Sequence, residues 1–471
     1  MAKLKITNFS QMNPEAPEYG PKNQNYLLSG VDPFYYLAQT AVQEQRVAPL
    51  AASRTFVSFN TFPGNIVFLL PSSITTFDAL VLTDDGTVSG SDLTNFGQPN
   101  GASPNVGMRA AIFSANVLWI TPTSANLFRK PITTPAASWT ITTPLNLFGV
   151  GAGVRFLKPF LDFCAVSDND GTAKNSNHIV RKIDSGFLAS LGIDLGVGWN
   201  IVAMENYNNR YLAVVGSYSG DGTFSGGMAD INYLFLWNGI SARYNSAVRI
   251  PGIFWDMKVI GDTLYFVIVE RLNQFALYKL VNNSLVKVFN IAIDTVKSGA
   301  NANTVGYGLF NYNDALGINL NSKGQFIYDT FNKSKYILTP QDFTLEQRAG
   351  PNGIIYAAKN TVLYTYQASG YSPITYVSQW IPFQDPKTIV VKYATPPGAG
   401  DSIQVTLLGY DEDGTASSSL PLQVIDNTHF YNSYKTPLDC KGFRGKQVQV
   451  KLQTVSASGW APIIREVELI N

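Results

Sequence analysis

The sequence feature that most constrains the fold is a recurrence of paired apolar runs every ~45 residues. Each run is rich in Val, Ile, Phe, Tyr and Thr and ends at Gly, Asn, Asp or Pro, which is typical of strands joined by tight turns. The clearest copy, residues 253–289, predicts four strands, and the copy before it runs from Trp199 to Tyr244 in the same order. Asn208-Asn209 and Asn238-Gly239 stand at the two turns of that earlier copy, where such residues tolerate the positive φ of a hairpin.

Weaker copies of the same unit precede and follow these two. They cover residues 56–89, 108–132, 154–186, 307–338 and 352–368. Seven copies of a four-stranded unit that close radially form a seven-bladed β-propeller, which we expect at residues 46–383. The copy at 352–368 is short, so we expect a strand from elsewhere in the ring to complete it.

The pattern changes at the Pro-rich segment 382–386. Beyond it, five or more stretches alternate apolar and polar residues, among them DSIQVTLLGYD and KQVQVKLQTV. Alternation of this kind suits strands with one face buried and the other in water. We therefore expect residues 384–471 to form a small antiparallel β-sandwich, and the whole chain to be all-β.

The first 45 residues lack strand alternation. They combine several Pro, Asn and Gln residues with one helix-like stretch from Pro33 to Gln45. Their apolar residues are too sparse for a separate core but numerous enough to need covering. We interpret residues 1–45 as an assembly arm that packs against another subunit, so that deleting residues 1–30 should leave a folded propeller that fails to assemble. The contacts expected from this arm are Phe9, Leu27, Leu28, Phe34, Tyr35 and Tyr36.

The composition argues against several classes of protein. Hydrophobic residues make up 45% and charged residues 14% of the chain, which is too apolar for disorder. A net charge of +1 without basic runs gives no electrostatic basis for binding nucleic acid or an anionic membrane. No segment reaches the ~18 apolar residues of a membrane span, and the N-terminus lacks the apolar stretch of a signal peptide. We expect synthesis in a cytoplasm.

Acidic residues are the only candidates for chemistry, and their spacing is unfavourable. The turns at 84–86, 168–171 and 411–414 lack the ligand spacing of a calcium loop, so we interpret them as hairpin turns. Residues 167–173 approach the Asp box of propeller sialidases, but Asn169 replaces the Asp and the Trp is missing. A glycosidase also needs two carboxylates on one cleft. The candidates, each more easily explained as a turn or strand-edge charge, are Glu205, Asp256, Asp262 and Glu270.

Histidine and cysteine offer no site either. His178 and His429 are too few and too far apart for a triad or a metal site. Cys164 and Cys440 form no Cys-x-x-Cys pair and are interpreted as core residues. The stretch from Gly216 to Gly227, rich in Gly and Ser, is either a partner-binding insertion or a solvated loop. We therefore predict no catalytic residue, no cofactor and no metal.

Segments at the two ends of the chain resemble tail proteins of tailed bacteriophages. The opening KITNFSQMNP, residues 5–14, is similar to their Asn-Phe-Ser-Gly-(Met/Ile)-Asn-Pro-like start, with Gln11 in place of the usual Gly. Residues 380–383, 388–393 and 462–469 resemble the sandwich that follows propeller domains in virion tail proteins. The resemblance implies a structural role in the virion tail, as in podophage tail nozzle proteins or siphophage minor tail proteins. It brings no catalytic residues.

Three functions remain open at this point. The first is a non-enzymatic structural component of a virion tail, in which copies form a symmetric ring and contact neighbouring tail proteins. The second is a carbohydrate- or receptor-binding virion module, which requires exposed aromatic rings beside polar groups on one propeller face. The third is a propeller glycoside hydrolase, which requires two cleft carboxylates ~5 to 10 Å apart. We take the first as the working hypothesis, because interfaces favour the Tyr, Phe and Trp that this chain has in excess.

Overall fold

The protein is all-β in a computed structural model, and no helix occurs in the residues that the structure describes. These residues are 3–6, 27–29, 31–32, 37–39, 41–45, 58–62, 65–71, 77–83, 93–97, 109–120, 126–134, 136–142, 147–148, 156–171, 177–219, 231–270, 274–296, 308–312, 315–330, 335–339, 348–349, 355–359, 362–371, 374–393, 397–410, 416–428, 435–455 and 463–471. Within them, no helix is long and apolar enough to span a membrane.

Most of the chain folds into four-stranded antiparallel units in which consecutive strands are neighbours. The first units comprise β6 (Ser58–Phe62), β7 (Asn65–Pro71), β8 (Phe77–Thr83) and β9 (Leu93–Gly97); β10 (Arg109–Phe113), β11 (Asn116–Ile120), β12 (Leu127–Pro131) and β13 (Thr140–Thr142); and β14 (Leu157–Phe160), β15 (Phe163–Asp168), β16 (Ile179–Ile183) and β17 (Ala189–Asp194). The next comprise β18 (Trp199–Tyr207), β19 (Tyr211–Tyr218), β20 (Asn232–Trp237) and β21 (Ser246–Ile250); β22 (Ile253–Ile260), β23 (Thr263–Val269), β24 (Phe275–Val281) and β25 (Ser284–Ile291); and β26 (Leu309–Tyr312), β27 (Ala315–Asn319), β28 (Gln325–Tyr328) and β29 (Lys335–Thr339).

The tight turns of these units follow from their residues. Asn208, Asn209, Asn282 and Asn283 adopt positive φ between β18 and β19 and between β24 and β25, and Gly239 does so between β20 and β21. Asparagine and glycine take this conformation at low cost, which matches the right-handed twist of the flanking strands. The four strands predicted at residues 253–289 and the turn at Asn208-Asn209 are therefore confirmed. In the earlier copy the tight turn expected at Asn238-Gly239 is wrong: residues 238–245 form a longer connection, and the fourth strand is β21, beyond Tyr244.

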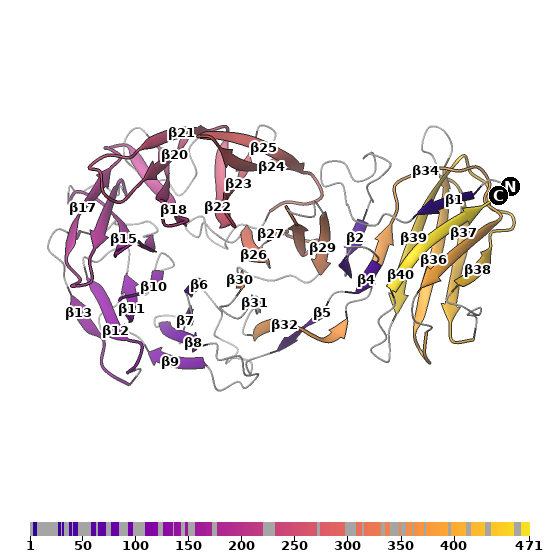
Figure 1. The fold of residues 1–471 in the computed structure, drawn as a ribbon, viewed down its shortest axis with the longest axis horizontal. Coiled ribbons are helices and arrows are strands. Elements are labelled where there is room, and N and C mark those ends of the chain that lie inside the picture. The colour runs from indigo at the N-terminus through magenta and orange to yellow at the C-terminus, as the bar shows by residue number, and fades with distance from the viewer. Residues whose placement is uncertain are drawn as a thin grey trace.

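The units are arranged around a ring, as Figure 1 shows. The first strand of each unit contacts the first strand of the next, in the order β6, β10, β14, β18, β22, β26 and β30 (Arg348–Ala349). Buried apolar residues fill the space between neighbouring units, for example Phe163 of β15 against Trp237 of β20, whose ring centroids are 5.7 Å apart. The core is thus distributed between the faces of adjacent sheets.

A strand from the N-terminal segment completes the last unit. Strands β30, β31 (Ile355–Lys359) and β32 (Val362–Tyr371) form three of its strands, and β5 (Ala41–Gln45) pairs with β32 as the fourth. The register places Glu44 opposite Thr365. This is the strand that the short copy at 352–368 required, and it joins the beginning of the ring to its end.

Two further sheets form the C-terminal part of the molecule (Figure 1). One contains β1 (Lys3–Ile6), β3 (Val31–Asp32), β4 (Leu37–Gln39), β35 (Thr388–Tyr393), β38 (Lys435–Asp439) and β40 (Ile463–Ile470). The other contains β33 (Thr375–Val377), β34 (Ile381–Pro382), β36 (Ser402–Tyr410), β37 (Ala416–Asp426) and β39 (Gln447–Val455), and continues through β2 (Leu27–Ser29) to β29. Buried residues of both sheets, such as Val391 and Val405, belong to one hydrophobic core.

The N-terminal segment differs from the sequence-based expectation. The described residues of Pro33 to Gln45 form strands, so the helix-like interpretation is wrong. Strands β1 to β5 all pair with strands of the same chain: β2, which holds Leu27 and Leu28, lies between β29 and β33. The expected contacts Phe9, Phe34, Tyr35 and Tyr36 lie outside the described residues.

The C-terminal sheets begin earlier in the chain than the expected boundary at residue 384. Strands β33 and β34, which precede this residue, already pair with β39.

Candidate functional site

Glu205 is bound to a lysine of the neighbouring unit. It lies in β18, and both of its carboxylate oxygens accept hydrogen bonds from Lys158 Nζ in β14, at 3.0 Å each. Both side chains are mostly buried. Because β14 and β18 are the adjacent first strands of two consecutive units, this ion pair links the units across the inside of the ring.

Asp256 and Asp262 are also used in structural contacts. The buried carboxylate of Asp256 accepts hydrogen bonds from the backbone N–H groups of Met257 and of Leu309, both at 2.8 Å, and so ties β22 to β26. Asp262 lies in the turn after β22, where its Oδ1 accepts a hydrogen bond from Asn208 Nδ2 at 3.1 Å. Each aspartate thus joins its own unit to a neighbouring one.

Glu270, at the end of β23, has the most elaborate surroundings. Its carboxylate accepts hydrogen bonds from the Tyr278 hydroxyl and, at 2.7 Å, from Lys287 Nζ. Burial raises the pKa of Glu270, but the hydrogen bonds from Lys287 and Tyr278 outweigh it and hold the pKa below its ordinary value. Burial and the hydrogen bond to Glu270 raise the pKa of Tyr278. A carboxyl group that acts as a general acid needs a raised pKa, which is the opposite of the shift at Glu270.

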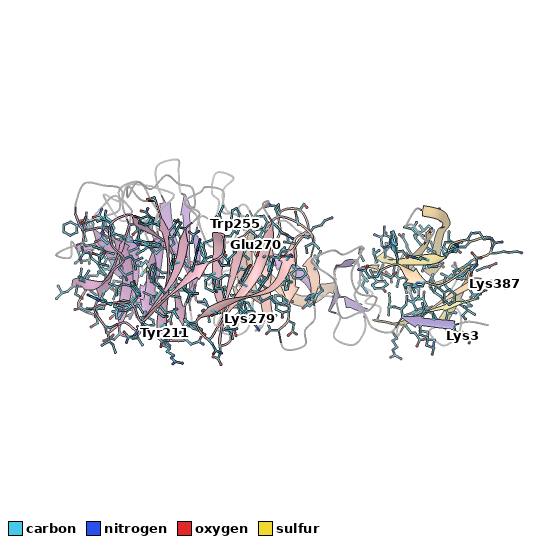
Figure 2. The ribbon with its side chains drawn as sticks, turned by 90° about the horizontal axis from the view of Figure 1, so that it is seen from above. Lys3, Tyr211, Trp255, Glu270, Lys279 and Lys387 are labelled. Carbon is cyan, nitrogen blue, oxygen red and sulfur yellow. The ribbon has the colours of Figure 1, made fainter. Side chains whose placement is uncertain are left out.

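Figure 2 shows Glu270 and Trp255 toward one face of the ring, and Tyr211 and Lys279 toward the other.

The remaining described candidates, Asp168, Asn169 and His178, are also engaged in contacts within the fold. Asp168 is fully buried, with its Oδ2 2.6 Å from Arg181 Nε, and Asn169 Oδ1 accepts the Gly171 N–H, which makes residues 168–171 a closed turn. His178 is buried, with Nε2 3.8 Å from Asp194 Oδ1. His429 and the acidic turns at 84–86 and 411–414 lie outside the described residues. Over the described part of the chain, no group of three or more His, Cys, Asp or Glu side chains could hold a metal ion.

An aromatic cluster lies beside the Gly- and Ser-rich stretch. Trp199 at the start of β18 contacts the rings of Tyr218, Tyr233 and Phe235, with centroid distances of 5.2, 5.7 and 5.3 Å. The Tyr218 ring packs on Gly198, where a Cβ would lie 2.7 Å from a ring carbon, so a glycine is required there. Trp199 and Tyr233 pack against the core between two units, while Tyr218 is 38% exposed. Residues 220–227 of the stretch lie outside the described part of the chain.

Parts of three segments that resemble phage tail proteins meet in one sheet. β1 begins the chain, β40 lies close to its end, and the two pair antiparallel with Ile6 opposite Val467. β35, residues 388–393, pairs with the other side of β40 and places Val391 opposite the same Val467. The segments 388–393 and 462–469 are thus hydrogen-bonded neighbours, and from the opening segment Lys5 and Ile6 join them, while residues 7–14 lie outside the described residues.

Charged side chains reinforce this terminal sheet. Glu466 Oε1 lies 2.5 Å from Lys392 Nζ and 3.6 Å from Lys5 Nζ, and Glu468 lies 3.8 Å from Lys3 Nζ. No ion pair was expected at these residues from the sequence. The signal that could have found them is the alternation of Lys-Leu-Lys at 3–5 with Glu-Val-Glu at 466–468, which fits two paired strands of opposite charge.

Comparison with known proteins adds no family. No family model matches the chain, and no curated protein is similar to it in sequence. The chain is similar in structure to a chain of an S. cerevisiae complex of a Dbp5 variant with Nup159, a Gle1 variant, IP6 and ADP (11% identity, 76% of this chain and 98% of that chain, TM-score 0.41). It is also similar to a chain of a mitotic checkpoint complex (6% identity, 70% and 96%, TM-score 0.34). A third is an exo-β-1,3-galactanase of Phanerochaete chrysosporium with galactose (8% identity, 92% and 100%, TM-score 0.32). Because each TM-score lies below 0.5, these similarities do not bear on the function.

Proposed function

We propose that the ring is a seven-bladed β-propeller and that the two C-terminal sheets form a β-sandwich. The blades begin at β6, β10, β14, β18, β22, β26 and β30, and β5 closes the last of them. The contacts between first strands in chain order support a radial arrangement, and the pairing of β5, which precedes β6, with β32 of the last unit supports closure. A shared hydrophobic core between the C-terminal sheets supports the sandwich.

We further propose that the protein is a non-enzymatic structural component of a bacteriophage virion tail. It is made in the host bacterial cytoplasm and assembles with copies of itself and with neighbouring tail proteins. The observation that carries this proposal is the pairing of β35 with β40, two segments identified by resemblance, in the sheet that also holds Lys5 and Ile6 of the opening segment, because separate short resemblances gain weight when they form one structural unit. The four candidate carboxylates support a non-enzymatic role, since each is bound within or between units.

The proposal is tested on particles of the phage that encodes this chain. Purified virions are analysed by quantitative peptide mass spectrometry, and the isolated chain is imaged by negative-stain electron microscopy. We expect the chain in multiple copies per particle and in rings when isolated. Its absence from purified particles, with abundant chain in the lysate, would contradict the proposal.

A second candidate function is carbohydrate binding, favoured by the exposed Tyr218 beside Ser219 and Trp199. On a glycan array, Tyr218→Ala should then lose a signal that the unmodified chain gives. Tyr244→Ala is the matched control, because Tyr244 is similarly exposed and packs on Phe235 of the same unit. An array without signal for the unmodified chain would exclude this candidate for the glycans on the array.

A further inference from the structure

β4 and β5 are separated by one residue of the chain but belong to different sheets. β4 ends at Gln39 and β5 begins at Ala41, so that Thr40 alone lies between them in the sequence. β4 pairs with β40 of the terminal sheet, while β5 pairs with β32 of the last unit of the ring. Figure 1 shows β4 next to β40 and β5 next to β32. We call β4 and β5 together the strap.

The connection within the strap has almost no slack. Consecutive Cα atoms are about 3.8 Å apart, so the Cα atoms of Gln39 and Ala41 are separated by about 7.6 Å at most. Pairing of β4 with β40 therefore keeps the first residue of β5 within a small volume beside β32. A strand that is tethered closely to its binding position has a high effective concentration there, and this concentration falls as the tether lengthens.

β5 depends on its tether more than the fourth strands of the other units do. β9, β13, β17, β21, β25 and β29 each follow the third strand of their unit directly in the chain. β5, in contrast, lies hundreds of residues before β32. The other segment that attaches β5 to the ring, residues 46–57 before β6, is longer than the single residue on the β4 side. β4 is thus the nearest fixed point for β5 along the chain.

The pairing of β5 with β32 is limited in extent. Residues 43–45 lie opposite residues 364–366 in regular register. The next pair is Ala41 with Tyr371, so the register shifts and the ladder is interrupted. Among the described strands, β5 pairs with β32 and with no other strand. A short, irregular ladder with one partner belongs to the part of a fold that opens at low free energy.

We propose that the strap couples closure of the ring to the terminal sheet. While β4 is paired with β40, β5 is held at β32, and release of β4 from β40 lets β5 leave β32 and opens the last unit. The coupling is reciprocal, because the factor by which β4 pairing strengthens β5 pairing is also the factor by which β5 pairing strengthens β4 pairing. This inference concerns a single chain: it rests on the proposed closure of the ring by β5 and not on the proposed role in a virion.

Hydrogen–deuterium exchange of the full-length chain, measured by mass spectrometry of its peptides, reports the opening of each strand. The first variant is Ala38→Pro. β4 is paired on both sides, by β3 and by β40, so a proline at residue 38 cannot maintain both ladders. We expect faster exchange in the peptide that covers β4. Exchange in the peptides that cover β5 and β32 should also rise about tenfold, within the usual 5- to 150-fold range of couplings between two sites.

Lys5→Pro is the matched control. Lys5 lies in β1 opposite Glu468, so this variant weakens a second short strand that pairs with β40. β1 is followed by residues 7–26 before β2, and a single residue does not join it to a strand of the ring. We expect Lys5→Pro to accelerate exchange in β1 and to leave β5 and β32 as they are in the unmodified chain. In every variant, the peptides that cover β23 and β24 show whether the rest of the ring is folded.

Lengthening the connection between β4 and β5 isolates the contribution of the strap. Insertion of about six Gly and Ser residues after Thr40 retains both strands but gives the connection slack. In the chain with this insertion, Ala38→Pro should no longer accelerate exchange in β5 and β32. From the other end, Glu44→Pro in β5 should accelerate exchange in β4 by the same factor as Ala38→Pro does in β5. If β23 and β24 lose protection in Ala38→Pro, Glu44→Pro decides the question.

Three results would show that the inference is wrong while the ring stands. Ala38→Pro could loosen β4 and leave β5 and β32 unchanged, Lys5→Pro could loosen β5 and β32 equally, or the chain with the insertion could respond to Ala38→Pro as the original chain does. A different result bears on the ring itself. If β5 and β32 of the unmodified chain exchange as fast as an unfolded peptide, β5 does not close the ring, and the proposed closure fails.

Discussion

The buried pair of Asp168 and Arg181 shows what one charged residue does in this fold. Asp168 is completely buried, and besides Arg181 it accepts the backbone N–H of Phe148 at 3.0 Å. The Arg181 guanidinium also lies 5.2 Å from the centre of the Phe148 ring. The pair thus fixes the segment before β14 to the strands β15 and β16. Its removal would leave a buried cation without its carboxylate.

We predict that Asp168→Ala lowers the free energy of unfolding by about 3 to 5 kcal/mol, the usual cost of breaking a buried ion pair on one side. Urea unfolding followed by tryptophan fluorescence measures it. Lys287→Met is the control, since it breaks the more exposed pair with Glu270 and should cost about 1 kcal/mol or less. Equal losses in the two variants would contradict the prediction.

The two cysteines should be unreactive in the folded protein. Cys164 and Cys440 are free and buried, and burial raises the pKa of both thiols, that of Cys440 to about 11. Because the thiolate is the reactive form, an Ellman assay at pH 8 should detect no thiol in the native chain and both after denaturation. Rapid reaction of either thiol in the native chain would show that the surrounding core opens.

At the scale of elements, the terminal sheet should respond to acid. The hydrogen bond from Lys392, with smaller contributions from Lys5, lowers the pKa of Glu466 below 4.5, against the effect of burial. A carboxyl with a lowered folded-state pKa stabilises the fold above its unfolded-state value, and this stabilisation is lost as pH falls through the folded-state pKa. Glu466→Gln should therefore flatten the dependence of stability on pH below about 4.5. An unchanged profile would mean that this ion pair does not contribute.

The elements that the sequence predicts well are those whose signals are local. The hairpins at Asn208-Asn209 and Asn282-Asn283 need only their own residues, because the turn chemistry and the flanking apolar runs are adjacent. Strands β2, β4 and β5 are short, and they pair with β33, β40 and β32, which lie hundreds of residues away, so no local periodicity marks them. For the same reason, the Lys and Glu residues of the terminal sheet became apparent only from the pairing.

At the scale of the whole molecule, the ring and the C-terminal sheets are joined twice. The chain passes between them once near residue 374, and once between β4, which pairs with β40, and β5, which pairs with β32. One hydrophobic cluster also includes buried residues of β23, β27 and the C-terminal strands. Two connections and a shared core restrict hinge motion far more than one linker would.

We predict that the two fragments stay associated when one of these connections is cut. A protease site inserted between residues 371 and 374, once cleaved, should give two fragments that co-elute in gel filtration, because β1, β3 and β4 still tie the N-terminal fragment to β40. The control is a chain without residues 1–40, which retains β5 but lacks those strands, and its fragments should separate more readily. If the fragments of the cleaved full-length chain separate at the same salt and protein concentration, this account is contradicted.

The pairing of β1 with β40 also has a consequence for biosynthesis. Ile6 leaves the ribosome first, but its partner Val467 is translated at the other end of the chain, on the order of a minute later. Contacts so distant in sequence form slowly, and until they form, β1 is not paired with β40. A chain that stops before β40 cannot bury Leu4 and Ile6 in this sheet, so closure of the fold itself distinguishes chains that include β40 from truncated ones.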